Sequence, residues 1–232
     1  MSSTSAPTPA SEPRRFSSLF GNVELVIVVL LGIVSVVTAY ASFQAALYGS
    51  MMDSYYAQST RLTAEAESAY LEGNQQYVQD SATIARLLEL EIESTSTDPA
   101  VAQVAMEQRE ALTFVAVSDD LTAAIDWSDA ENAADPNFYT PPQNNEAYLE
   151  ALFGGWAQLN EEAAEATALG DESNTFGDRL TLNTVLFAVS LFLLGVAAVL
   201  GSRRAQYVLM GISSAVFALG LALTVTIPFV SL

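Results

Sequence analysis

The stretch TAYASFQAALYGSMMDSYYAQSTR, Thr38 to Arg61, changes from apolar to polar and charged sequence without a proline and with a single glycine. Its first half completes the apolar run LVIVVLLGIVSVVTAY, residues 25–40. Beyond Gly49, apolar residues such as Tyr55, Leu62 and Ala69 recur at helical spacing. We therefore expect the chain to leave a membrane near Tyr48, while the helix continues to about Leu71.

Three long windows carry no charged side chain, namely residues 25–52, 180–202 and 205–232. A transmembrane helix needs about 20 apolar residues, so each window is long enough to span a bilayer. Hydrophobic residues make up 51% of the chain and its mean hydropathy is +0.30. We predict an all-α protein with transmembrane helices at residues 22–48, 180–202 and 205–230. The Ser- and Pro-rich residues 1–21 are predicted to form a disordered cytoplasmic tail.

The charges predict an orientation in the plasma membrane. Arginine pairs precede the first span (Arg14, Arg15) and join the second to the third (Arg203, Arg204), and such pairs favour the cytoplasmic side. All but Glu12 and Glu24 of the 27 acidic residues lie within residues 49–179. The N-terminus is thus expected inside, and the acidic segment 49–179 and the C-terminus outside.

An alternative for the first span is a signal peptide cleaved after Ala39-Tyr40-Ala41. The polar leader is long for such a signal, and low charge continues past the site. We therefore favour an uncleaved membrane anchor.

The acidic segment contains further helical patterns. Residues 72–76 (EGNQQ) predict the end of the first helix, and a second helix is expected over about 75–94, although LELEIE (88–93) also alternates like a strand. Asp98 and Pro99 predict the N-cap and first position of a third helix, reaching to about Asn132.

A proline-rich loop at 134–145 separates these patterns from a fourth expected helix at about 146–168. Gly154-Gly155 within that helix indicates close packing or a kink. Each of the four expected helices has an apolar stripe, and these stripes are covered from water only if the helices pack against one another. We therefore predict a four-helix extracytoplasmic bundle, with its first and last helices joined to spans one and two.

The composition excludes many catalytic and metal sites. The chain has no His, no Cys and no Lys, so the common zinc, haem and iron–sulfur ligands, Cys nucleophiles, Ser-His triads and lysine Schiff bases are all absent. No glycine-rich phosphate-binding loop ending in lysine occurs. We predict no cofactor and no enzymatic activity.

The acidic stretch SDDLTAAIDWSDAENAADP, residues 118–136, contains the candidate metal ligands Asp126, Asp129, Glu131 and Asp135. Carboxylates bind Ca²⁺, or act as acid/base pairs, of which Asp126, Asp129 and Glu131 are the candidates here. The spacing does not match an EF-hand, because the central glycine and final glutamate are missing. A solvated acidic face is the simpler interpretation.

The predicted spans contain no ionisable residue in their cores, which argues against a proton relay. Their polar residues include Asn183, Ser190, Ser213, Ser214, Thr224 and Thr226. We expect these to hydrogen-bond to neighbouring helices rather than to line a pore. The pairs Ala197/Gly201 and Gly211/Ala215 favour close helix packing, so spans two and three should form a hairpin.

Three stretches carry a resemblance: TAYASFQAALYGS (38–50), YLEGNQQYVQD (70–80) and GDRLTLNTVLFAVSLFLLGVAA (177–198). Together they are similar to uncharacterised three-span membrane proteins of actinobacteria. The resemblance implies a bacterial plasma-membrane protein and brings no activity with it.

The leading functional hypothesis is a non-enzymatic membrane protein whose acidic ectodomain mediates assembly or partner contacts. Its expected partners are the lipid bilayer, further copies of the chain or another membrane protein, and divalent cations. Nucleic acid is excluded, because the acidic segment repels phosphates. The alternative is a homo-oligomeric cation channel with an acidic vestibule.

Overall fold

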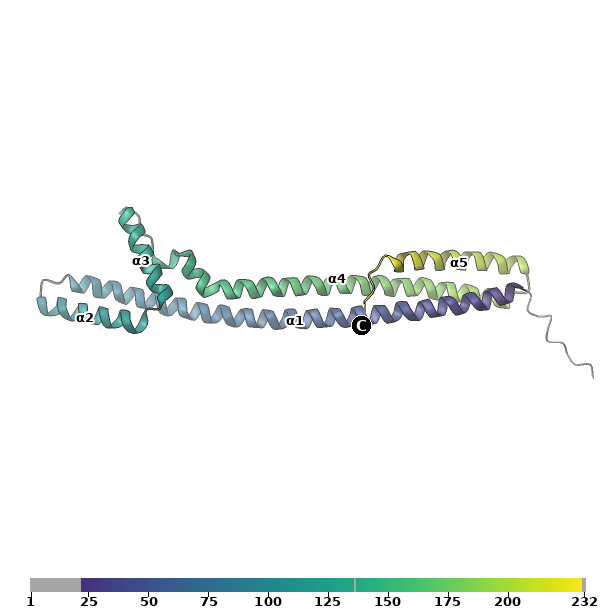
Figure 1. The fold of residues 1–232 in the computed structure, drawn as a ribbon, viewed down its shortest axis with the longest axis horizontal. Helices are drawn as coiled ribbons and strands as arrows, with labels where there is room; N and C mark the ends of the chain where they lie inside the picture. Colours follow the sequence, from purple (N-terminus) through teal and green to yellow (C-terminus); the bar gives the residue numbers. More distant parts are fainter. Residues whose placement is uncertain (1–21, 136, 231–232) are drawn as a thin grey trace, which may run out of the picture. The chain divides into compact units, whose positions relative to one another are not determined.

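The computed structural model describes residues 22–135 and 137–230, and this part of the chain consists of helices joined by short connections, without a strand. The elements are α1 (Asn22–Ser94), α2 (Pro99–Ala116), α3 (Asp119–Ala134), the short 3₁₀ helix η2 (Pro142–Asn144), α4 (Glu146–Val199) and α5 (Arg203–Val225) (Figure 1). The predicted all-α class is confirmed. The predicted cytoplasmic tail, residues 1–21, lies outside the described residues.

The chain divides into two compact units. We call Met52–Asp171 the acidic unit, and the remainder, which is described over residues 22–51 and 172–230, the span unit. Helices α1 and α4 each contribute a segment to both units.

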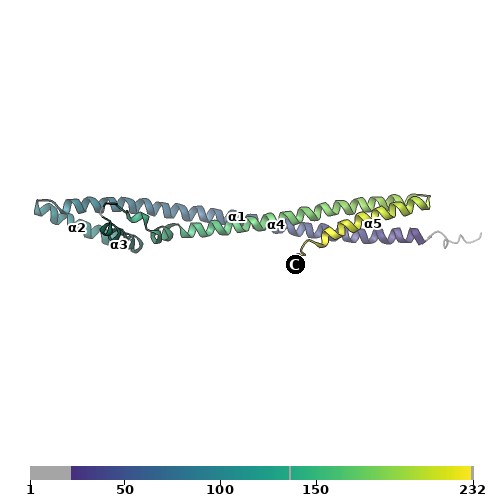
Figure 2. The same cartoon turned by 90° about the horizontal axis from the view of Figure 1, so that it is seen from above.

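In the acidic unit, the segments of α1 and α4 run antiparallel beside each other in both views (Figures 1 and 2). Leu62 packs with Ala163 and Ala166, and Ser59 shares a hydrogen bond of 2.8 Å with Thr167. Buried positions on α1 recur every seven residues at Ala66, Gly73 and Asp80. A seven-residue recurrence is the spacing that keeps one helix face on its partner, as in coiled coils.

The predicted helix end at residues 72–76 is wrong, because α1 continues unbroken to Ser94. Gly73 faces α4, where an added Cβ would collide with the backbone of Leu152. This glycine therefore permits close approach of two helices and does not end one. The strand-like pattern at 88–93 is also helical, since it lies within α1.

The predicted third helix begins as expected and ends early. Asp98 caps α2 by accepting a 2.9 Å hydrogen bond from the Ala100 N–H, with Pro99 in the first position. The helix then stops at Ala116 and does not reach Asn132. Ser118 caps a new helix, α3, by accepting from the Leu121 N–H, and Asp119 and Asp120 stabilise its first turn through the helix dipole.

Helix α4 also departs from the prediction, since residues 169–179 continue the helix instead of separating an outer helix from a span. Gly170 lies against the Tyr56 ring, so it too serves close packing. The predicted division into four outer helices is therefore wrong, because the first two expected helices are one part of α1 and the third is divided into α2 and α3. The acidic unit contains segments of the two long helices together with α2, α3 and η2.

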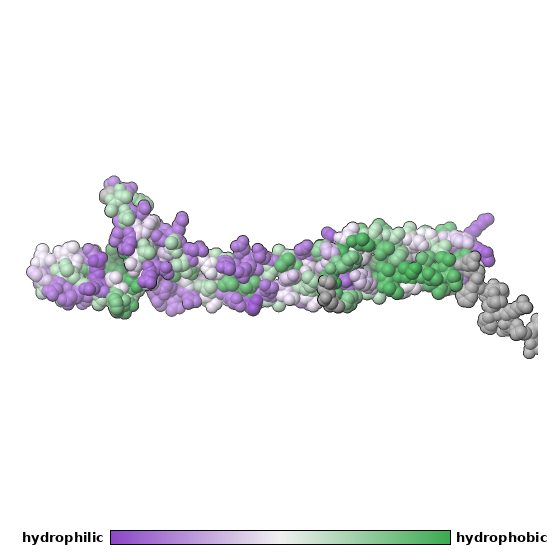
Figure 3. All heavy atoms as spheres, in the orientation of Figure 1, coloured by the Kyte–Doolittle hydropathy of each residue, from purple (hydrophilic) through white to green (hydrophobic). Residues whose placement is uncertain are grey.

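Three helices of the described chain are long and apolar enough to cross a membrane, namely α1, α4 and α5. In the span unit, Ile27, Val34 and Ala41 of α1 are buried at seven-residue intervals with Phe187, Leu194 and Ala197 of α4. The visible surface of this unit is strongly hydrophobic, whereas hydrophilic residues dominate that of the acidic unit (Figure 3). An apolar exterior of this kind suits a lipid environment.

Helices α4 and α5 form the expected hairpin. Ser190 and Ser213 are fully buried, and their hydroxyl oxygens lie 2.7 Å apart. A second hydrogen bond joins the same two helices, since the Asn183 side-chain amide of α4 donates to the Thr224 hydroxyl of α5 over 3.1 Å. These four polar residues therefore hydrogen-bond between neighbouring helices, as predicted.

The segment after α5 is held against α1 within the span unit. The Gln44 amide accepts a hydrogen bond from the Val230 N–H at 3.1 Å and donates to the Val230 carbonyl at 3.3 Å. The Tyr48 hydroxyl donates to the Pro228 carbonyl at 2.7 Å. These bonds satisfy backbone groups that no helix satisfies.

Candidate functional site

The acidic unit contains an open groove formed by the last turns of α1, by α2, by α3 and by the segment before η2. Its volume is about 510 Å³, within the range of ligand-binding clefts. Apolar side chains that line it include Ile84, Leu87, Leu88, Val117, Ile125 and Tyr139. The charged residues Glu91, Arg109, Asp126 and Asp129 line it as well. We call this feature the acidic groove.

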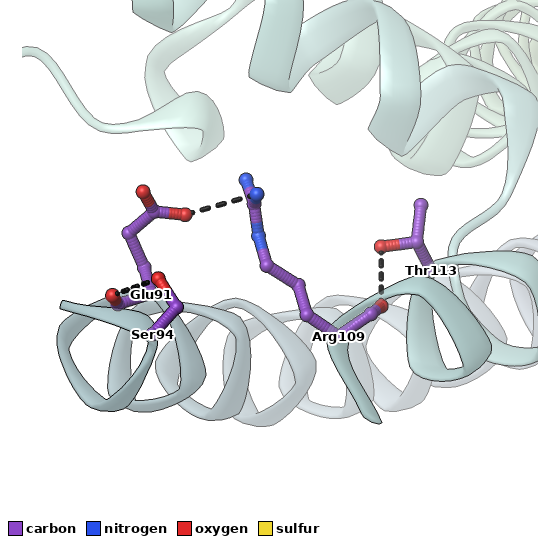
Figure 4. Close-up of polar contacts among 4 residues, drawn as sticks. All are labelled: Glu91, Ser94, Arg109 and Thr113. Carbon is purple, nitrogen blue, oxygen red and sulfur yellow. Dashed lines mark hydrogen bonds and ion pairs between the residues drawn. The ribbon is translucent and has the colours of Figure 1, made fainter. Parts of the chain in front are cut away.

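An ion pair joins α1 to α2 at the groove. The Arg109 guanidinium reaches across to Glu91, with Nη1 and Oε2 3.0 Å apart (Figure 4). Both side chains are about half exposed, at 54% and 52%. The neighbouring hydroxyls of Ser94 and Thr113 donate back to the carbonyls of Glu91 and Arg109 (Figure 4). Because the pair is screened by water, it orients Arg109 and adds little stability.

The α3 side of the groove is fixed by a hydrogen-bonded loop. Ser128 donates to the Thr140 carbonyl at 2.6 Å, and the Asn132 side chain both donates to that carbonyl and accepts from the Thr140 N–H at 2.7 Å. These two polar side chains are thus occupied in holding the loop. In the described chain, no hydrogen bond or ion pair engages the carboxylates of Asp126 and Asp129.

A buried carboxylate, that of Asp80, lies on α1 four residues before the groove residue Ile84. Asp80 is 1% exposed and accepts hydrogen bonds from the Tyr148 hydroxyl at 2.8 Å and from the Gln76 amide at 2.7 Å. Burial, and then the hydrogen bond to Asp80, raise the pKa of Tyr148 above its ordinary value of 10.0. Tyr148 also packs with Ile84, which lines the groove. The network anchors the start of α4 to α1, beside the groove residue Ile84.

The four predicted calcium ligands separate into two sets. Asp126 and Asp129 line the acidic groove, and Glu131 and Asp135 are not among its lining residues. Asp135 instead accepts from the Asn137 N–H at 3.1 Å, which shapes the loop after α3. Within residues 22–135 and 137–230, no group of three or more acidic side chains is placed to hold a metal ion. The calcium site stays a prediction.

Sequence reasoning missed Arg109 and the Asp80 network. The signal for Asp80 was its place seven residues after Gly73, on the stripe that α1 buries. Arg109 is one of three arginines in the acidic unit, the others being Arg61 and Arg86, and so it stood out by rarity alone. Its contact with Glu91 depends on how α2 folds back along α1, which no local pattern reveals.

Comparisons with known proteins found no family model, no curated protein and no solved structure that matches the chain. The resemblance to actinobacterial membrane proteins therefore stays a prediction. The chemistry of the groove is the basis for a functional proposal.

Proposed function

We propose that this chain is a non-enzymatic integral membrane protein whose acidic unit mediates assembly or binds a partner protein. In this proposal the plasma membrane holds α1, α4 and α5, with the N-terminus cytoplasmic and the acidic unit and C-terminus outside. The apolar length of the three helices and the arginine pairs support that arrangement.

The observation that carries the proposal is the acidic groove. Leu88 and Tyr139 line it and are 49% and 59% exposed, beside the unengaged carboxylates of Asp126 and Asp129. Apolar side chains open to water next to polar groups mark surfaces used for binding. The absence of His, Cys and Lys from the sequence supports binding over catalysis.

The channel alternative receives less support. In that alternative, polar Ser and Thr side chains of the spans would line the pore, yet Ser190, Ser213 and Thr224 are buried and hydrogen-bonded, the last of them to Asn183, within the α4–α5 hairpin of one chain. A pore through these positions would require the hairpin to give up those bonds.

Native mass spectrometry of the complex, gently extracted from its own membrane, tests the proposal. We expect a defined mass that contains a second protein or additional copies of the chain. A single chain alone would overturn the proposal, and a closed ring of this chain that conducts cations in a bilayer would favour the channel.

Site-specific photo-crosslinking then tests whether the groove is the contact. A photoreactive residue at Leu88 should capture the co-purifying protein. The control position is Leu71, an exposed leucine of the same helix that does not line the groove. Equal capture at both positions would show that the contact lies elsewhere.

A further inference from the structure

The charge of the acidic unit restricts what the groove accepts. Only Arg61, Arg86 and Arg109 oppose the many carboxylates of residues 52–171. All three lie beside glutamates: Arg61 near Glu65, Arg86 near Glu89 and Arg109 near Glu91. The field at the groove is therefore negative. It attracts cationic ligands and opposes nucleic acid, anionic lipid and a second copy of the same acidic unit.

The polar groups left in the groove favour a basic side chain. Ser128 and Asn132 are occupied by the loop, and Glu91 by Arg109. Asp126 and Asp129 remain as acceptors on α3, and among the described residues that line the groove the only cationic side chain is that of Arg109, which is paired with Glu91. A carboxylate without a protein donor is matched by lysine or, more specifically, by the two-pronged guanidinium of arginine.

The apolar part of the groove requires a second property of the ligand. Leu87, Leu88 and Ile125 offer a hydrophobic surface that a small hydrated cation or a polyamine would leave uncovered. A ligand that covers it must carry apolar side chains on the same face as its positive charges. In proteins, an amphipathic helix laid into a groove between helices provides that pattern.

From these observations we infer that the acidic groove binds a basic amphipathic helix of a partner protein. The apolar face of that helix covers Leu88 and Ile125, and its lysine or arginine side chains pair with Asp126 and Asp129. This inference rests on the proposed function and names the chemistry of the partner.

The test uses the full chain in phosphatidylcholine nanodiscs, with empty nanodiscs as the blank. Three fluorescent peptides serve as probes: a leucine–lysine amphipathic helix, the same peptide with glutamate in place of lysine, and a scrambled leucine–lysine peptide without an apolar face. We expect the first to bind, with affinity falling as salt increases, and the other two to bind at least tenfold more weakly.

Two matched pairs of variants locate the binding. Asp126→Asn with Asp129→Asn should weaken binding of the leucine–lysine helix by about tenfold, since two rim charges are lost. Glu161→Gln with Glu162→Gln removes the same charge from exposed α4 positions outside the groove and should change it less than twofold. Leu88→Ser should weaken binding, whereas Leu71→Ser, at another exposed α1 leucine, should not.

Several results overturn the inference. Equal weakening by both charge pairs would mean that only the overall field acts, and equal binding of the glutamate or scrambled peptide would remove the basic or the helical requirement. If no peptide binds although native mass spectrometry finds a partner, the inference fails and the proposed function stands. If native mass spectrometry finds the chain alone, with neither a partner nor further copies, the proposed function fails as well.

Discussion

Helices α1 and α4 pair in both units, yet the two units expose opposite kinds of residue. The span unit exposes Val28, Phe192 and other large apolar side chains and encloses the hydrogen-bonded Ser190 and Ser213. The acidic unit exposes its carboxylates and encloses Leu62, with small residues such as Ala66, Ala163 and Ala166 around it. The difference is the one expected between lipid and water as solvent.

In water, burial of apolar surface drives the helices together, so the interface is apolar and the exterior charged. In lipid, that driving force is missing, and helices associate through close packing and interhelical hydrogen bonds. The buried polar groups of the two units should therefore differ in what their removal costs.

The largest effect is expected at the buried polar group of the acidic unit. Tyr148→Phe removes a donor from the buried Asp80 carboxylate and should lower the free energy of unfolding by about 2–3 kcal/mol. Urea unfolding followed by tryptophan fluorescence measures this unit, because Trp127 and Trp156 both lie in it. Tyr139→Phe, at an exposed tyrosine, is the control and should change little. A loss below about 0.5 kcal/mol would show that Asp80 is solvated.

Close helix approach should give the next effect. Gly73→Ala places a Cβ against the Leu152 backbone and should cost the acidic unit about 2 kcal/mol, although alanine favours helix. Gly155→Ala is the matched control in α4, where a Cβ meets nothing within 4 Å, and it should stabilise by up to about 1 kcal/mol. Similar values for both variants in the same fluorescence assay would contradict the close contact.

Alkaline pH should destabilise the acidic unit. The pKa of Tyr148 is raised in the folded state by burial and by Asp80, and that of Tyr56 by its hydrogen bond to Asp171. Above the ordinary tyrosine pKa of 10.0, the unfolded chain therefore loses these protons first, and stability falls as pH rises. In Tyr148→Phe the decline should be shallower, and an unchanged slope would count against this assignment.

The buried pair Ser190 and Ser213 of the span unit should contribute less to the free energy of unfolding than the buried Asp80 of the acidic unit. Ser190→Ala removes the hydroxyl that pairs with Ser213 and should cost about 0.6 kcal/mol, and no more than about 1.7. Unfolding in dodecyl sulfate, followed by far-ultraviolet circular dichroism, measures the change. A loss as large as that of Tyr148→Phe would remove the distinction between the two units.

The smallest effect is expected at the surface ion pair. Arg109→Gln breaks the contact with Glu91 and should change the unfolding free energy of the acidic unit by less than about 0.5 kcal/mol, because both groups are half exposed. Repeating the fluorescence measurement at high salt should reduce the change further. A loss above about 1 kcal/mol would indicate that the pair is desolvated.

Local sequence was sufficient for features that depend on a short segment alone. The apolar windows predicted the three helices able to span a membrane, and Asp98-Pro99 predicted the start of α2. Polar residues within the apolar spans were also predicted to hydrogen-bond to a neighbouring helix, as Asn183, Ser190, Ser213 and Thr224 do. In each case the physical cause lies within the segment itself. The cause is apolar length for the spans, a capping oxygen for α2, and a single polar group in an apolar run for the buried polar residues.

The same reasoning failed where a residue acts through a distant partner. A glycine among polar residues lowers helix propensity, so the local sequence predicts a helix end at Gly73. Its actual role, to let α1 and α4 approach closely, is given only by the contact with Leu152. The break before Ser118 was overlooked, although Ser118-Asp119-Asp120 carries both a cap and dipole-favoured acids. Two of the four candidate metal ligands, Asp126 and Asp129, line the groove. Glu131 does not, because it points in another direction around α3, and Asp135 does not, because it follows the end of that helix.

By itself, the sequence determined that the chain is helical, that three of its segments are apolar enough for a membrane, and that the region between the first two is acidic. Hydropathy, charge and capping are properties of consecutive residues, so they are readable from the chain directly. The tertiary structure decided that α1 and α4 run without interruption, that Asp80 is buried beneath Tyr148, and that Arg109, Asp126 and Leu88 share one groove. These depend on which helix faces meet, because burial and hydrogen bonding are set by residues far apart in sequence.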